Sequence, residues 1–112
     1  MGLEASVLAV SESLVPQVRF ILQQRGVTCD QLPLGESDDP QTFLLKLLCS
    51  QDDGVVLLSV QREPHIHQDG PVIVLYPFPD SRKHRLISSR LMDTIAEILT
   101  ENGAWALVHT PS

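Results

Sequence analysis

Residues 55–60, with the sequence VVLLSV, decide the expected fold. This almost wholly apolar run has the length of a β-strand, and its lack of alternation indicates burial on both faces. We therefore place it at the centre of a β-sheet. Two further apolar runs, at residues 5–10 and 72–76, predict additional strands of the same sheet.

Three other stretches carry apolar residues at helical spacing. They cover residues 11–26, 40–52 and 88–103. The first and third begin near serines, which cap helices well, and the second begins at Pro40 after a group of acidic residues. Each of the three stretches ends near a glycine, the residue that best tolerates the left-handed conformation at a helix C-terminus. We expect helices at all three.

The order of these elements predicts the fold class. Residues 27–34 and 104–109 resemble short strands, so strands and helices alternate along most of the chain. The connections are long enough for right-handed crossovers between parallel strands. We expect one α/β domain over residues 1–112, with a mostly parallel central sheet and helices on both faces. Such a domain can also be part of a larger protein.

Composition narrows the classes of function. The 112 residues are 43% hydrophobic, and 8 basic residues against 14 acidic residues give a net charge of −6, which disfavours binding to a polyanion by charge alone. The two cysteines, Cys29 and Cys49, are too few for a disulfide framework, so we expect reduced thiols. With no cationic leader and no apolar run of about 18 residues, we expect a soluble intracellular chain without a membrane partner.

Motifs for nucleotide, metal or covalent chemistry are weak. The glycines are scattered singly, which disfavours a phosphate-binding loop, and no GxSxG sequence occurs. His65 and His67 alternate along the chain and His84 offers a third ligand, yet no cysteine or acidic residue completes a known metal-ligand spacing. We therefore expect no metal, no cofactor and no catalytic residues.

One enzymatic alternative remains open at this stage. Ser11, Cys29 and Ser59 lie at or near expected strand ends, where α/β proteins bind their ligands. The alternative function is a small α/β enzyme or a phosphate-binding carrier that uses these residues. A base within hydrogen-bonding reach of one of them would favour it.

A basic cluster precedes the last expected helix. It comprises Arg82, Lys83, His84 and Arg85. Guanidinium groups at strand ends suit phosphate groups or an acidic partner, whereas the simpler interpretation is a solvated face. We take this cluster as the best candidate binding loop, with RNA as a candidate partner.

The expected helix at residues 40–52 contains an LxxLL sequence formed by Leu44, Leu47 and Leu48. On a helix these three leucines share one face and fit a hydrophobic groove of a partner. The sequence looks like the short box with which coactivators engage nuclear receptors. Burial of the same leucines against the sheet is the alternative, because an amphipathic helix of an α/β domain needs such a face.

The order of elements resembles the anticodon-binding domain of class II aminoacyl-tRNA synthetases, and more closely the anticodon-binding-like domain of nuclear receptor coactivator 5. The features that carry this resemblance lie within residues 7–99. They are Ile66 and His67 after the third strand, Pro79 after the fourth, and His84 and Arg85 before the last helix. The acidic balance and the lack of a recognisable anticodon-contacting set depart from the synthetase pattern.

The resemblance implies a non-catalytic binding module of a nuclear transcriptional coregulator. It further implies protein partners, among them a nuclear receptor, with RNA as a second class of partner. It does not imply binding of tRNA. The residues that carry it have a structural role in that family rather than a catalytic one.

Overall fold

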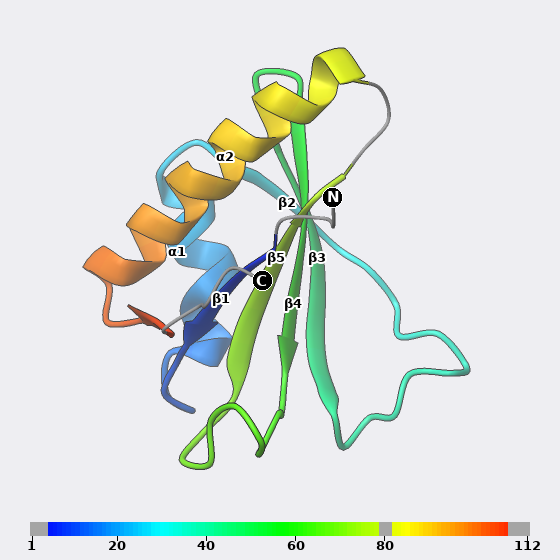
Figure 1. The fold of residues 1–112 in the computed structure, drawn as a ribbon, viewed down its shortest axis with the longest axis vertical. Coiled ribbons are helices and arrows are strands. Elements are labelled where there is room, and N and C mark those ends of the chain that lie inside the picture. Colours follow the sequence, from blue (N-terminus) through cyan, green and yellow to red (C-terminus); the bar gives the residue numbers. More distant parts are fainter. Residues whose placement is uncertain (1–4, 79–81, 108–112) are drawn as a thin grey trace.

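The computed structural model describes residues 5–78 and 82–107, and of residues 82–85 it describes the backbone alone. Within these residues, six strands form one sheet in the order β2-β3-β4-β5-β1-β6 (Figure 1). Every neighbouring pair of strands is antiparallel. The elements, in chain order, are β1 (Ser6–Ala9), a 3-10 helix (Val15–Gln17), α1 (Val18–Gln24), β2 (Thr28–Gln31), β3 (Phe43–Gln51), β4 (Gly54–Gln61), β5 (Val72–Pro77), α2 (Arg82–Glu101) and β6 (Trp105–Ala106).

The predicted mostly parallel sheet with helices on both faces is therefore wrong. The main cause is the segment at residues 40–52, which we expected to be a helix and which contains β3. As a helix it would have provided a crossover between parallel strands. As a strand it joins β4 through a hairpin, and a hairpin connection makes the two strands antiparallel.

The turn between β3 and β4 consists of two residues in the left-handed region. Asp52 has φ 50° and Asp53 has φ 68°. Two consecutive residues with positive φ match the twist of the flanking strands in a tight hairpin. Gly54 follows, and a Cβ atom there would lie 3.0 Å from the carbonyl oxygen of Ile87 on α2. The helix can thus approach the start of β4 closely.

Both helices lie on one side of the sheet (Figure 1). α2 packs mainly across β4 and β5, and α1 packs between α2 and β2. The side chains of β4 that point to this side, Val56, Leu58 and Val60, are fully buried. They join apolar residues of both helices in one core between the sheet and the helical layer.

A buried serine connects α2 to the sheet. Ser88 has no solvent exposure, and its Oγ accepts a hydrogen bond of 3.0 Å from the backbone N–H of Val55. We had expected the last helix to begin beyond this serine, whereas α2 begins six residues earlier, at Arg82. Ser88 therefore lies inside the helix and binds a strand rather than capping the helix.

The other predicted elements agree better with the structure. Strands at residues 5–10, 55–60 and 72–76 are confirmed, and the helical stretch at residues 11–26 contains the 3-10 helix and α1. The short strands predicted within residues 27–34 and 104–109 correspond to β2 and to the two-residue β6. Neither helix in the described part of the chain combines the length and apolar character that crossing a bilayer requires.

Candidate interaction surface

Five apolar side chains form a continuous cluster on the side of the sheet opposite to the helices. The antiparallel register places Leu48 of β3 beside Leu57 of β4, and Leu57 beside Tyr76 of β5. Val55 lies two positions before Leu57 on β4 and projects to the same side, because side chains alternate along a strand. Phe78 directly follows β5, and its backbone N–H donates to the carbonyl oxygen of Val55 at 2.8 Å, so it continues the register opposite Val55. We call this cluster of Leu48, Val55, Leu57, Tyr76 and Phe78 the apolar sheet face.

The apolar sheet face is accessible to solvent. Tyr76 is 37% exposed and Phe78 is 47% exposed, and the other three members are half-buried. None of the five belongs to the core that the helices cover. Within residues 5–78 and 82–107, both helices pack on the opposite side, so no described helix shields this cluster.

Polar residues border the cluster on β2 and β3. Asp30 pairs with Leu48, and Thr28 pairs with Ser50, which in turn pairs with Val55. An apolar centre with a polar rim is the usual anatomy of a protein–protein interface. This arrangement can exclude water from the centre while hydrogen-bonding groups at the rim orient a partner.

A neutralised lysine lies beside the cluster. The ammonium group of Lys46 is 2.7 Å from Oδ2 of Asp38 and 5.0 Å from the centre of the Phe43 ring. The hydrogen bond from Lys46, and after it the one from the Gly35 N–H, holds the pKa of Asp38 below its ordinary value. Because the two charges compensate each other, this corner adds little net charge to the surface.

The far end of the same side of the sheet is covered by two rings. Trp105 pairs with Ala9 across β6 and β1, and its ring meets the ring of His67 edge to face at 5.5 Å. Nδ1 of His67 lies 3.0 Å from the carbonyl oxygen of Gly70, to which it donates a hydrogen bond. Among the side chains that the structure describes, no three metal-binding residues gather in one place, at His67 or elsewhere.

The LxxLL leucines do not share a face. They belong to β3 rather than to a helix, and our helix prediction for them was wrong. Leu47 is fully buried in the core, whereas Leu48 lies on the apolar sheet face. Leu44 lies at a β-bulge and packs against the core. A helical docking peptide therefore cannot form here while β3 is intact.

The basic cluster falls partly outside the described residues. The backbone of Arg82, Lys83, His84 and Arg85 forms the first turn of α2, rather than the loop that we expected. Their side chains lie outside the described part of the chain, as does Pro79. The candidate role of this cluster stays a prediction.

The strand-end residues of the enzymatic alternative make hydrogen bonds to neutral groups. Oγ of Ser11 is 3.1 Å from Oγ of Ser13, and Oγ of Ser59 donates to Oε1 of Gln61 at 2.9 Å. The thiol of Cys29 contacts the carbonyl oxygen of Val27 and the thiol of Cys49. In the described residues, none of these contacts supplies the base that nucleophilic catalysis needs.

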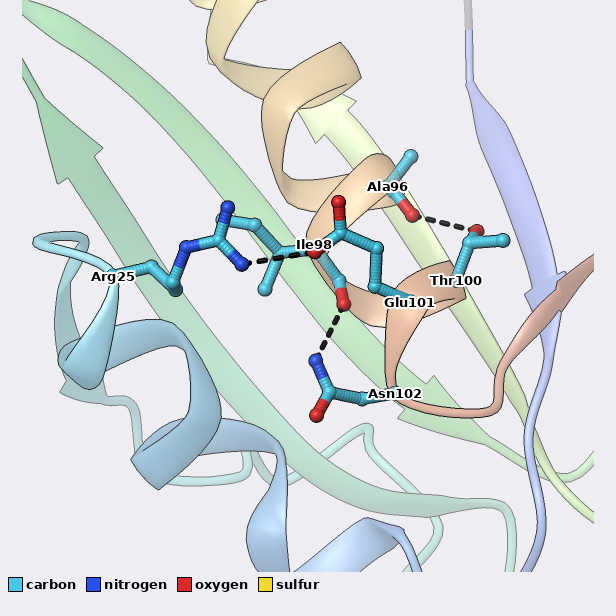
Figure 2. Close-up of polar contacts among 6 residues, drawn as sticks. All are labelled: Arg25, Ala96, Ile98, Thr100, Glu101 and Asn102. Carbon is cyan, nitrogen blue, oxygen red and sulfur yellow. Dashed lines mark hydrogen bonds and ion pairs between the residues drawn. The ribbon is translucent and has the colours of Figure 1, made fainter.

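A groove of about 530 Å³ lies between β1, β6 and the C-terminal end of α2. Figure 2 shows the polar contacts at this end of α2, where Arg25 binds Glu101 through an ion pair of 2.9 Å. The side chains of Thr100 and Asn102 donate to backbone carbonyl groups of the same helix. These contacts join the C-terminal end of α1 to α2 and satisfy backbone carbonyl groups of the last turns of α2.

Comparison of the chain with protein-family models, with curated proteins and with solved structures gave no match. The resemblance to the anticodon-binding-like domain accordingly stays a prediction. The apolar sheet face was not among the sites that we predicted from the sequence. Its signal is the absence of alternation in residues 55–60, which we had interpreted as cover on both faces.

Proposed function

We propose that this domain is a non-catalytic protein-binding module and that the apolar sheet face is its contact surface. The observation that carries the proposal is the row formed by Leu48, Leu57 and Tyr76 across three adjacent strands. Contiguous apolar patches on a domain surface are characteristic of interaction sites, because leaving them in water is unfavourable. Tyrosine and phenylalanine are also enriched in interface centres.

The charges near this surface favour a protein partner over RNA. Exposed aromatic rings on a sheet can stack on bases, but RNA binding also needs basic groups that track the phosphates. Around the apolar sheet face, the described side chains offer Lys46, which Asp38 already neutralises, and the acidic Asp30. The net charge of −6 adds a general repulsion of polyanions.

The resemblance to a coregulator domain supports a more specific proposal. In that context the module belongs to a nuclear transcriptional coregulator and binds a protein of the transcription machinery, such as a nuclear receptor ligand-binding domain. The LxxLL sequence does not support such a complex, because its leucines lie on strand β3 and not on a helix. The apolar sheet face replaces it as the candidate contact.

A titration of isotope-labelled chain tests this proposal. The three ligands are a receptor ligand-binding domain, single-stranded RNA and structured RNA, and a dilution series of the chain itself tests self-association. We expect amide shift changes on β3, β4 and β5 with a protein partner and none there with RNA. No response of these strands to any protein, including a second copy, would contradict the proposal. Amide shift changes at the first turn of α2 on addition of RNA would instead support the basic cluster as an RNA-binding site.

A matched pair of variants localises the contact. Leu57→Lys places a charge at the centre of the apolar sheet face. Phe20→Lys places the same charge on α1, where Phe20 is 53% exposed. We expect Leu57→Lys to abolish the amide shift changes caused by the partner and Phe20→Lys to leave them unchanged. Well-dispersed amide signals must show that both variants are folded.

A further inference from the structure

The two cysteines lie side by side in the core. Cys29 of β2 and Cys49 of β3 are direct partners in the antiparallel register, and both are buried. Their Sγ atoms are 3.9 Å apart. Two thiols that are 20 residues apart in the chain thus meet at one point of the fold.

The hydrogen-bond pattern fixes the kind of pair that they form. The N–H of Leu32 donates to the carbonyl oxygen of Lys46 at 2.9 Å, so this pair is a hydrogen-bonded one. Hydrogen-bonded and non-hydrogen-bonded pairs alternate along an antiparallel ladder, so Cys29 and Cys49, three positions away, form a non-hydrogen-bonded pair. The carbonyl of Cys29 agrees with this assignment, because it accepts a hydrogen bond from Nε of Arg19 at 3.1 Å rather than from β3.

A non-hydrogen-bonded pair has the geometry that a disulfide requires. The Cα atoms of such pairs are about 4.5 Å apart, which lies within the range of about 4.4–6.8 Å found for disulfide-bonded cysteines. Both side chains also project to the same side of the sheet. The pairing of β2 with β3 is therefore compatible with a bond between the two sulfurs, whose present separation is 3.9 Å.

The surroundings make the two thiols unequal. The hydrogen bond with Cys49 lowers the pKa of Cys29, and the charge of Arg19 acts in the same direction against the opposing effect of burial. The same hydrogen bond, together with burial, raises the pKa of Cys49 above its ordinary value. Cys29 is consequently the thiol that ionises first, and the thiolate is the reactive form.

We propose that Cys29 and Cys49 are a dithiol site that forms an intramolecular disulfide by exchange with a low-molecular-weight disulfide. The Cys29 thiolate attacks one sulfur of the small disulfide, whose S–S bond breaks and releases one thiol after protonation. Cys49 then loses its proton and attacks the Cys29 sulfur, which releases the second small thiol. The two protein thiols are oxidised, and the small disulfide is reduced to two thiols.

Access to the site comes from the position of β2. This strand has four residues, lies at the edge of the sheet and, among the described strands, pairs with β3 alone. Short edge strands open locally at a lower free energy than the centre of a sheet, and such opening exposes Cys29. The disulfide then ties β2 to β3 next to Asp30, the residue that pairs with Leu48 of the apolar sheet face.

Equilibration of the whole chain in glutathione buffers of rising oxidised fraction tests the proposal, with intact mass and thiol titration as readouts. We expect both thiols to disappear together, in a monomer whose mass is lower by two hydrogen atoms. The folded chain should reach half-oxidation with about tenfold less oxidised glutathione than the chain in denaturant, because the fold raises the effective concentration of one thiol at the other. Free thiols at the most oxidising ratio, or a glutathione adduct or a disulfide-linked dimer as the final product, would overturn the proposal.

Single variants separate the roles of the two residues. Cys49→Ser should accumulate a stable glutathione adduct at Cys29, because the second attack is missing. Cys29→Ser should leave Cys49 unmodified under the same conditions. The reverse pattern would contradict the proposed order of attack, and amide dispersion in the NMR spectra of both variants checks that β2 and β3 remain folded.

Discussion

Leu47 and Leu48 are consecutive in the chain, and they lie on opposite faces of the sheet. Leu47 is fully buried beneath the helices, whereas Leu48 pairs with Leu57 on the apolar sheet face. One strand therefore serves the core with one set of residues and the candidate interaction surface with the alternate set. The two leucines can be tested separately.

Alanine substitutions at these positions should have very different effects on stability. Leu47→Ala removes buried methyl groups and leaves a cavity, so we expect a loss of about 2–5 kcal/mol in the free energy of unfolding. Leu48→Ala should cost less than about 1 kcal/mol, because its side chain is partly hydrated already. Urea unfolding of both variants measures the difference. Equal losses would contradict the assignment of the two faces.

The hairpin turn between β3 and β4 should accept glycine. Asp53 has a φ of 68°, which is costly for a residue with a side chain. Asp53→Gly relieves this cost and matches the residue preferred at the second position of such turns, so we expect a gain of about 0.5–1 kcal/mol in urea unfolding. A loss of stability would show that the aspartate makes a compensating contact.

The next residue should respond in the opposite direction. A Cβ atom at Gly54 would lie 3.0 Å from the Ile87 carbonyl oxygen and 3.2 Å from Cβ of Leu91. Gly54→Ala therefore forces α2 away from the sheet, and we expect a loss of about 1–3 kcal/mol. Thermal unfolding of both variants checks this result: the melting temperature of Gly54→Ala should fall, whereas that of Asp53→Gly should rise. An unchanged value would contradict the close approach of α2.

Removal of the Ser88 hydroxyl should destabilise the domain. In Ser88→Ala the N–H of Val55 loses its acceptor, the buried Oγ at 3.0 Å. An unsatisfied, partly buried donor costs about 1–3 kcal/mol. Ser89→Ala, on the same helix, provides the control, and urea unfolding gives both values. A Ser88→Ala variant as stable as the control would rule out this contact as an anchor.

The ion pair of Lys46 and Asp38 should give stability a defined pH dependence. The pKa of Asp38 is lower in the folded state than in the unfolded state. The ionised carboxylate therefore stabilises the fold above its unfolded-state pKa of about 3.9, and this stabilisation is lost as the pH falls through its folded-state pKa. We expect wild type to be more stable than Asp38→Asn near neutral pH and the difference to vanish in acid. Denaturant titrations at a series of pH values provide the test, and a difference that grows in acid would contradict it.

The antiparallel topology follows from one segment that carries two patterns. The leucines of residues 44–48 fit helical spacing, yet Leu45, Leu47 and Cys49 also alternate, and it is the alternation that the core uses. We interpreted Asp52, Asp53 and Gly54 as the end of a helix, although two turn residues between apolar runs equally indicate a hairpin. Local spacing does not distinguish these possibilities, because the pairing of β3 with both β2 and β4 decides between them.

The candidate surface was missed for a related reason. The run VVLLSV correctly predicted the central strand, but a run without alternation does not reveal what covers its second face. Val56 and Leu58 belong to the core that the helices cover, whereas Val55 and Leu57 alternate with them along β4 and project to the other side. Cross-strand neighbours such as Tyr76 become visible only once the register is known.

Site-specific photo-crosslinking in cells tests the central claim most directly. A photoreactive phenylalanine analogue is placed either at Tyr76, on the apolar sheet face, or at Phe20, on α1, two exposed aromatic positions. We expect a discrete protein crosslink from position 76 that is lost when Leu57→Lys is added, and none from position 20. Crosslinks that arise from position 20 alone, or that persist from position 76 in a folded Leu57→Lys chain, would contradict the assignment of the apolar sheet face as the contact surface.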